Sequence, residues 1–260
     1  MRILAISSQV AYGPVGLSAA VPPLQAAGHE VLAVPTIMLS NHPGHAPPAG
    51  FRTSPEDLGK ILASLDGLRV LDGAAAALTG FFASPGQVEA AASILVRMKS
   101  ANPALSILID PVMGDGAELY VPEPVAAAIR DHLLPLATIT TPNRFELAWL
   151  SGRDVTDEAS AIAAARALGT PEVLATSVPQ GADHLATLLI TADGHHASVA
   201  PKLAQVPHGT GDMLSGLYLA ERVISGPEPA FRKTMTMLGR AIARSKGTAV
   251  LDVAGALAAQ

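Results

Sequence analysis

The chain has 260 residues, a formal net charge of −5 and no cysteine. The absence of cysteine excludes disulfides, thiolate catalysis and cysteine-ligated zinc. The acidic balance, without any basic run, gives no electrostatic support for a nucleic-acid or anionic-membrane partner. The first apolar run is too short for a signal peptide, and no later run reaches the roughly 18 residues of a membrane span, so we expect a cytoplasmic protein.

Segments of strand length and helix length alternate through the first two thirds of the chain. In chain order they predict a strand at 3–7, a helix at 16–27, a strand at 30–35, a helix at 54–65, a strand at 73–79, a helix at 84–100, a strand at 105–110, a helix at 122–133, a strand at 138–140, helices at 143–150 and 158–168, and a strand at 173–176. Pro22 and Pro23 should kink or shorten the first helix. Ser54-Pro55 and Ser84-Pro85 are typical helix starts.

The pattern changes in the last third of the chain. Residues 185–191 and 197–200 flank Asp193-Gly194, a hairpin signal, and two helices follow at 211–224 and 228–246. The alternation predicts an α/β fold with a mostly parallel central sheet and helices on both faces, and the hairpin adds antiparallel strands at one edge. No internal repeat or domain boundary is evident, so residues 1–260 are expected to form one domain.

Residues 41–48 are rich in proline, glycine and histidine and are interpreted as a loop, which we call the flap. His42 and His45 lie in it. Neither they nor His195 and His196 show the spacing of a metal-binding motif.

Ligands of open α/β sheets bind at the carboxyl ends of the strands. Polar clusters fall where such ends are predicted: Ser8-Gln9, Thr36, 110–115, 141–146, Thr176-Ser177 and 208–212.

The last cluster contains Gly209-Thr210-Gly211-Asp212 just before a predicted helix. Two glycines let the backbone approach a ligand closely, and free N–H groups at a helix start can bind an anion. A carboxylate beside them could take the proton of an alcohol that attacks phosphorus. The alternative is a structural glycine turn, with Asp212 favourably placed in a first helical turn.

Two further clusters allow both structural and functional interpretations. Asp110 and Asp115 suit metal–phosphate chemistry, because magnesium prefers oxygen ligands and keeps several waters, but they could also be solvated acids of a turn. Asn143 and Glu146 have the spacing of a helix capping box. They could equally face a metal or its waters, and both roles can hold together.

In combination and in order, Asp110-Pro-Val-Met-Gly-Asp115, Thr141-Pro-Asn143-x-x-Glu146 and Gly209-Thr-Gly-Asp212 resemble the ribokinase-like superfamily. Within it the chain resembles the pyridoxal kinase family. The stretch from Ser8 through Tyr12 to Gly16 is similar to that family's opening. Thr36 with 39–42 resembles its substrate flap, and Thr79-Gly80-Phe81 its Ser/Thr-Gly-Tyr stretch. Matching motifs run from residue 3 to about 220.

The resemblance implies ATP-dependent transfer of phosphate to an alcohol, the 5′-hydroxymethyl group of pyridoxal, a form (vitamer) of vitamin B6. Asp212 would be the base, and Gly209, Thr210 and Gly211 would supply the anion hole. Ser8, Thr36 and Asp212 would hold the pyridine ring, with Val15 and Phe81 packed near it.

The resemblance also implies the nucleotide side of the site. The ATP-binding residues would be Asp110, Asp115, Tyr120, Asn143, Glu146 and Thr176. Asp110 and Glu146 would organise Mg²⁺ through water, and the loop with Asp115 and Tyr120 would cover the phosphates. A monovalent cation is a further candidate, and a homodimer is expected.

The chain departs from the family pattern on the substrate side. Gln9 replaces an expected histidine, Pro14 is atypical, Phe81 stands where a tyrosine is usual, and the flap lacks the usual aromatic residue. Two alternatives therefore stay open. One is a hydroxymethylpyrimidine kinase, which shares His-Gly-Thr-Gly but usually carries cysteine in place of Asp212. The other is a catalytically weak vitamer-binding protein of the same fold.

Overall fold

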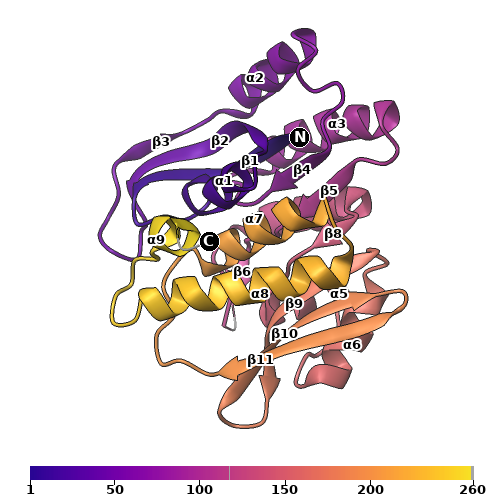
Figure 1. Cartoon of the computed structure of the whole chain (residues 1–260). Helices are drawn as coiled ribbons and strands as arrows, with labels where there is room; N and C mark the ends of the chain where they lie inside the picture. Colours follow the sequence, from indigo (N-terminus) through magenta and orange to yellow (C-terminus); the bar gives the residue numbers. More distant parts are fainter. Residues whose placement is uncertain (117, 259–260) are drawn as a thin grey trace.

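The computed structural model describes residues 1–116 and 118–258 (Figure 1). A nine-stranded sheet has the order β11-β10-β9-β8-β5-β4-β1-β2-β3. Its strands are β1 (Arg2–Tyr12), β2 (Glu30–Asn41), β3 (Gly50–Arg52), β4 (Ala76–Thr79), β5 (Ser106–Ile109), β8 (Ile139–Thr140), β9 (Glu172–Gln180), β10 (His184–Thr191) and β11 (Gly194–Pro201). A separate short hairpin is formed by β6 (Gly114–Asp115) and β7 (Glu118–Leu119).

The helices fill the connections between these strands. They are α1 (Leu17–Ala26), α2 (Pro55–Gly67), α3 (Pro85–Ala101), α4 (Glu123–Ala128), α5 (Arg144–Ser151), α6 (Glu158–Ala167), α7 (Thr210–Arg222), α8 (Pro227–Arg244) and α9 (Val253–Ala258). A π-helical turn, Ile129–Leu133, and a 3-10 turn, Leu134–Leu136, extend α4. Within the described residues, no helix has the length and apolar character that crossing a membrane requires.

The strand pairing confirms the predicted mostly parallel sheet. The strands from β2 through β1, β4, β5 and β8 to β9 pair in parallel. The pairs β9–β10 and β10–β11 are antiparallel, which confirms the hairpin predicted at one edge. At the opposite edge, β3 pairs antiparallel with β2. This strand was not predicted, because three residues are too few for an alternating pattern.

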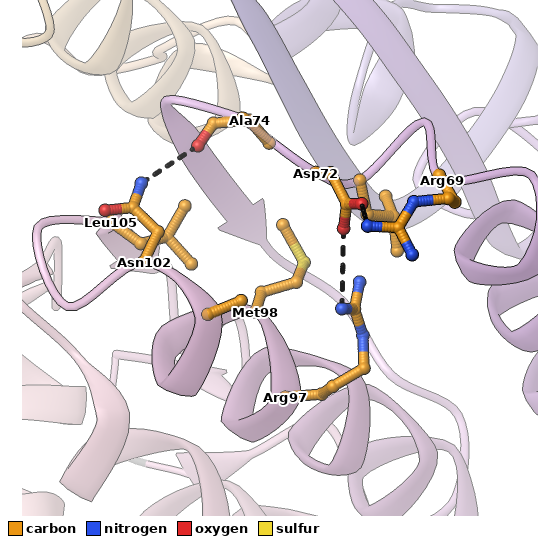
Figure 2. Close-up of a pocket in the computed structure, with 10 residues that line it drawn as sticks. Arg69, Asp72, Ala74, Arg97, Met98, Asn102 and Leu105 are labelled. Atoms are coloured by element: carbon orange, nitrogen blue, oxygen red, sulfur yellow. Dashed lines mark hydrogen bonds and ion pairs between the residues drawn. The ribbon is translucent and has the colours of Figure 1, made fainter.

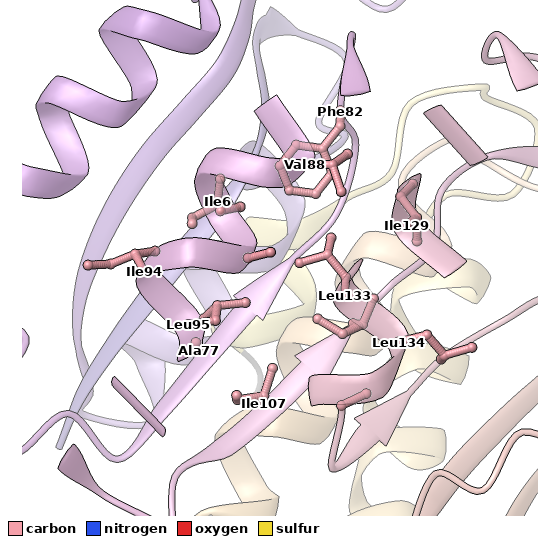
Figure 3. Close-up of a cluster of buried hydrophobic side chains, with 14 of the residues drawn as sticks. Ile6, Ala77, Phe82, Val88, Ile94, Leu95, Ile107, Ile129, Leu133 and Leu134 are labelled. Atoms are coloured by element: carbon pink, nitrogen blue, oxygen red, sulfur yellow. The ribbon is translucent and has the colours of Figure 1, made fainter. Parts of the chain in front are cut away.

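Alternate residues of the strands supply two apolar layers, one on each face of the sheet. One layer is an apolar cluster formed with α2, α3 and α4, and the sheet contributes Leu4, Ile6, Ala77 and Ile107 to it. Figure 3 shows other members of this cluster, among them Val88, Leu95 and Leu133. Ile3, Leu78 and Leu108 point the other way, toward α1, α7, α8 and α9. Helices α5 and α6 cover β9 and β10. Figure 1 shows α7 and α8 side by side across the sheet.

Three prolines do not limit the elements as expected. Helix α1 continues through Pro22 and Pro23 to Ala26, so the expected shortening is wrong. It packs tightly on α7, since a Cβ at Gly216 would lie 2.3 Å from the Ala20 carbonyl oxygen. Strand β2 passes Pro35 and ends at Asn41. Pro35 falls where the β1–β2 register shifts, so its missing N–H interrupts no regular ladder there.

Candidate active site

The carboxyl ends of the parallel strands lie along one end of the sheet. Asp212 lies there, in the first turn of α7. Residues 209–212, which we call the glycine turn, carry no side-chain cap, whereas α2 and α3 are capped by serines. The first N–H groups of α7 are therefore left to water or a ligand. This arrangement suits an anion held at the helix start.

Asp212 is positioned by backbone groups. The N–H of Gly16 and its own N–H hydrogen-bond the carboxylate. Burial raises the pKa of Asp212 to about 6, although these two bonds lower it. A carboxylate of this pKa accepts a proton more readily than a free aspartate and is still mostly ionised at pH 7.

Glycine is required on both sides of the contact between the Gly16 segment and the glycine turn. Gly209 has φ +87°, and a Cβ there would lie 2.0 Å from the carbonyl oxygen of Pro14. Gly16 has φ +57°, and a Cβ there would lie 2.3 Å from Oγ of Ser8. The loop before α1 and the glycine turn thus touch through their backbones. Ser8 and Val15, which the family resemblance placed on the substrate side, lie in or beside this contact.

Asp110 follows β5 and is 8% exposed. Oγ of Ser215 on α7 donates to Oδ2 of Asp110 at 2.8 Å, and Oγ1 of Thr141 lies 2.9 Å from Oγ of Ser215. Burial raises the pKa of Asp110 well above its usual range, and the negative charges of Asp212 and Glu146 raise it further, against these hydrogen bonds. The three carboxylates therefore share one electrostatic environment.

Asn143 and Glu146 form the capping box of α5 and also hold the loop after β5. Oε2 of Glu146 accepts the Asn143 N–H at 2.9 Å, and Oε1 accepts the Met113 N–H at 2.9 Å. Nδ2 of Asn143 donates to the Gly114 carbonyl at 2.7 Å. Burial raises the pKa of Glu146 to about 7, although its backbone hydrogen bonds lower it. The structural interpretation of this pair is thereby confirmed.

Asp115 lies in the β6–β7 hairpin, and Tyr120 is the residue that follows it. Both side chains are exposed. Gly114 allows the hairpin to lie on α5, because a Cβ there would lie 2.3 Å from the Phe145 ring. The Tyr120 N–H donates to the Met113 carbonyl at 3.1 Å. The hairpin is therefore anchored to the loop that Glu146 holds.

The substrate side is organised around the backbone of Phe81. Oγ of Ser7 accepts the Phe81 N–H at 3.0 Å, and Oγ1 of Thr36 donates to the Phe81 carbonyl at 2.7 Å. Nε2 of Gln87 donates to the Thr36 carbonyl at 2.8 Å. Thr36 is fully buried, so in this structure its hydroxyl positions Phe81. A Cβ at Gly80 would lie 2.4 Å from Oγ of Ser7, which explains the glycine.

A cavity of about 290 Å³ opens beside the β6–β7 hairpin. Its walls include Asp115, Phe145 and Ser177, together with the basic side chains of Arg144 and Lys202. Thr176, next to Ser177, donates its N–H to the Pro142 carbonyl at 2.9 Å and so lies against the Asn143 segment. This cavity offers positive charge beside the predicted ATP-binding residues.

A second cavity, of about 310 Å³, lies at the end of the sheet where β4 and β5 begin, and Figure 2 shows the residues that line it. It is formed by the segment before β4 and the end of α3. Arg97 pairs with Asp72 at 3.7 Å across it, and Nδ2 of Asn102 donates to the Ala74 carbonyl at 3.4 Å. It lies at the amino ends of β4 and β5, away from the carboxylates described above.

Sequence reasoning did not identify several residues that shape the site. Ser7, Ser215 and Gln87 act through hydrogen bonds to partners far away in sequence. Val112 and Ser177 adopt φ values of +42° and +59°, which are costly for side chains other than glycine. Val112 lies just after β5, whereas Ser177 lies within β9. Val112 and Ser177 did fall within predicted polar clusters, and Ser7 stood next to one, whereas no local pattern marked Ser215 or Gln87.

The carboxylates at this end of the sheet are candidate ligands for a divalent metal. Among the described residues, no group of three or more histidine, aspartate and glutamate side chains is arranged to hold a metal ion. Magnesium nevertheless keeps several waters and needs only one or two carboxylates beside substrate phosphates. Asp110 and Asp115 offer such oxygens, while both oxygens of Glu146 already accept N–H groups. The residues therefore fit a metal held with nucleotide and water.

The fold and the ordered polar motifs at one sheet edge define a kinase of the ribokinase-like class. A family model described as phosphomethylpyrimidine kinase matches residues 68–252. A pyridoxal kinase PdxY of Leifsonia xyli is 37% identical over 246 residues, covering 91% of this chain and 86% of the relative. One of Deinococcus radiodurans is 36% identical over 251 residues, covering 91% and 84%. The chain belongs to the pyridoxal kinase family.

Solved structures agree with this assignment. Pyridoxal kinase from Leishmania donovani in complex with ADP and pyridoxine superimposes with a TM-score of 0.92 at 32% sequence identity, covering 99% of this chain and 94% of that one. Pyridoxal kinase from Entamoeba histolytica gives a TM-score of 0.93 at 26% identity with the same coverage. The chain is thus a nucleotide-dependent kinase, and such kinases generally work with a divalent metal ion.

Proposed function

We propose that this protein transfers the γ-phosphate of ATP to the 5′-hydroxymethyl group of pyridoxal. The observation that carries the proposal is the glycine turn, which combines an uncapped helix start with the raised pKa of Asp212. The names of the relatives point to the same chemistry, since the Leishmania donovani structure contains ADP and pyridoxine.

The chemistry assigned to the chain is positioning and proton transfer. Asp212 takes the hydroxyl proton as the substrate oxygen forms a bond to the γ-phosphorus and the bond to the ADP oxygen breaks. The N–H groups of residues 209–211 stabilise the charge that develops on the transferred phosphoryl group. Gly16 keeps the Asp212 carboxylate aimed at this point through its N–H.

The vitamer lies on the β1, β2 and β4 side of Asp212 in this proposal. Ser8 offers a hydroxyl, and Val15 and Phe81 give apolar surface for the pyridine ring. Thr36 acts by holding the Phe81 carbonyl, since its hydroxyl is already engaged there. Phe81 has no hydroxyl, so ring recognition depends more on Ser8 and Asp212.

The nucleotide lies on the other side, over Asn143 and Thr176, with Asp115 and Tyr120 covering its phosphates. Arg144 and Lys202 supply positive charge to the triphosphate from the adjoining cavity. Asp110, with Glu146 acting through water, would organise Mg²⁺. When bound, Mg²⁺ neutralises charge on the phosphate oxygens. The same assays test a monovalent cation as an additional activator.

The direct test measures ATP turnover with pyridoxal, pyridoxine, pyridoxamine and hydroxymethylpyrimidine offered in parallel. We expect turnover with pyridoxal. Turnover confined to hydroxymethylpyrimidine would instead support the description of the matching family model. Saturable pyridoxal binding without turnover of any of the four would show that the protein binds vitamer but is not a kinase.

The remaining expectations about assembly belong to the same proposal. We take residues 1–260 as one kinase domain, because β1, near the N-terminus, and β11, in the last third of the chain, belong to a single sheet. A homodimer in the cytoplasm is expected from the family resemblance, and the cysteine-free sequence suits a reducing compartment. Sedimentation of the purified protein at several concentrations tests the dimer.

A further inference from the structure

Three histidines from two distant segments meet beside the glycine turn. His42 and His45 lie in the flap, and His208 immediately precedes the turn. The ring centroids of His42 and His208 are 4.2 Å apart, with 32° between the ring planes. His45 stands edge-on to both, at 6.1 Å from His42 and 5.9 Å from His208. Tyr12, at the end of β1, faces His45 at 5.6 Å. The flap therefore meets the segment that carries Asp212 through imidazole rings.

Two glycines make room for this cluster. A Cβ at Gly44 would lie 2.9 Å from Nε2 of His208 and 2.9 Å from Nδ1 of His42. A Cβ at Gly13 would lie 2.7 Å from Nε2 of His45, and Gly13 has φ +75°. The rings are thus packed against backbone on two sides, which is the geometry of a fitted contact.

The surroundings of His42 favour its neutral form, and His45 has a buried ring nitrogen without a partner. Nε2 of His45 is buried without a hydrogen-bond partner, so a proton there would be an unpaired buried donor. Nδ1 of His42 accepts the Gly44 N–H at 3.1 Å, so a proton at Nδ1 would break that bond. Burial lowers the pKa of His42, and the charges of His208 and His45 lower it further. In the described part of the chain, the histidine–carboxylate ion pairs are formed by β11 and not by these rings.

We propose that His42, His45 and His208 are positioning residues that hold the flap closed beside the glycine turn while they are neutral, and that protonation releases it. This inference rests on the proposed function and on the resemblance of Thr36 and residues 39–42 to the substrate flap of the pyridoxal kinase family. The titratable rings in contact within the cluster are the three imidazoles and Tyr12. The segment that pairs with His208, residues 248–251, carries no titratable side chain, and Asp212 lies one turn beyond His208.

The direction of the pH effect follows from the closed state. An imidazole on an open, hydrated flap has an ordinary pKa of about 6.5. In the closed flap His42 binds a proton less strongly than that, so closure is fully favoured above that pH and is progressively lost as the pH falls below it. Like charges 4–6 Å apart would then push the flap away from His208.

His208 provides the matched variants, because it is the exposed member of the cluster. His208→Phe keeps an aromatic ring against His42 but cannot take a proton, and a protonated His42 is attracted to a phenyl face. His208→Ala removes the ring. We expect the flap of His208→Phe to stay closed at pH 6 and that of His208→Ala to be open at both pH 6 and pH 8.

Hydrogen exchange of the flap amides, corrected for the intrinsic effect of pH, measures closure without any substrate. In the wild type we expect flap protection to fall by about tenfold between pH 8 and pH 6, and in His208→Phe by less than about threefold. The KM for pyridoxal should follow the same order, with His208→Ala raised at both pH values. Because Asp212 and pyridoxal are common to all three proteins, a pH effect that differs between the proteins is assigned to the substituted ring.

Equal flap protection at both pH values in the wild type would overturn the proposal. So would a fall in protection in His208→Phe as large as that in the wild type. The exchange result stands whether or not pyridoxal is turned over, so a failure of the proposed kinase activity is distinguishable from a failure of the flap inference.

Discussion

Ser215 hydrogen-bonds Asp110 across the boundary between α7 and β5, with 2.8 Å between Oγ and Oδ2. Ser215 lies three residues after Asp212, so the two side chains project from nearly the same face of α7. One helix thus carries the proposed base and also holds the carboxylate proposed for the metal. Any change in the position of α7 would move both sides of the site together.

Ser215→Ala should damage the nucleotide side selectively. The hydrogen bond from Ser215 lowers the pKa of Asp110, so its loss leaves Asp110 more readily protonated. We expect kcat/KM for ATP to fall by about tenfold near neutral pH and its acidic limb to move to higher pH. The comparison is Ser225→Ala, whose hydroxyl bonds only within the local helix end. An unshifted acidic limb would contradict the role given to Ser215.

Asp212→Ala should abolish most turnover and leave vitamer binding largely intact. A general base acts mainly in the transition state, so its removal lowers kcat by about 10²–10⁴-fold. Pyridoxal affinity, measured by calorimetry, is expected to change by less than about tenfold. Near-normal turnover would show that another group takes the proton.

Asp212→Asn should also stabilise the fold at alkaline pH. The pKa of Asp212 is about 6 in the folded protein, above its ordinary value of 3.8, so the native state binds this proton more strongly than the unfolded chain does. Stability therefore falls as the pH rises from about 4 to 6, and the penalty persists above that range. We expect Asn to raise Tm by about 2–6 °C at pH 8 and hardly at all at pH 4. Asp193→Asn, at an exposed hairpin turn, should leave Tm unchanged at both pH values.

Most of the fold was predictable because apolar runs of strand length alternate with helical segments through the first two thirds of the chain. The errors arose where tertiary packing decides the local structure. Helix α1 keeps Pro22 and Pro23 because it packs closely on α7, and β2 passes Pro35 because the neighbouring register shifts there. The β6–β7 hairpin and α9 were missed because each is too short to show a period.

The site was predictable only where its functional residues belong to short contiguous sequence motifs. The segments of Asp110, Asn143 and Asp212 could be recognised from their order, and they lie at one edge of the sheet. The hydrogen bond from Ser215 to Asp110 spans 105 residues. Nor could spacing show that His208 stacks on His42. Such contacts depend on how elements cross, which a local pattern does not encode.

Glu146→Gln should loosen the loop after β5. The carboxylate accepts N–H groups from Met113, Gly114 and Asn143, whereas a glutamine turns one of its two ends into a donor. A buried N–H without an acceptor costs about 1–3 kcal/mol. We expect Tm to fall by several degrees and KM for ATP to rise, as measured by calorimetry and steady-state kinetics. Glu89→Gln, on the exposed face of α3, should change neither quantity.

Gly209→Ala tests the close backbone contact that sets the glycine turn. The added Cβ would meet the Pro14 carbonyl at 2.0 Å, and φ of +87° is unfavourable for alanine. The loop before α1 would have to move away and take with it the Gly16 N–H that orients Asp212. We expect kcat to fall by about 10²-fold or more, because a displacement of about 1 Å suffices for such a loss.

The matched control for Gly209→Ala is Gly239→Ala in the middle of α8. A Cβ at Gly239 meets no atom within 4 Å, so alanine should stabilise the helix by about 0.5–1 kcal/mol and leave kcat unchanged. Circular dichroism distinguishes a displaced turn from an unfolded protein. If Gly209→Ala folded normally and kept wild-type kcat, the backbone contact would not be what positions Asp212, and the orientation of the base would have to come from the rest of α7.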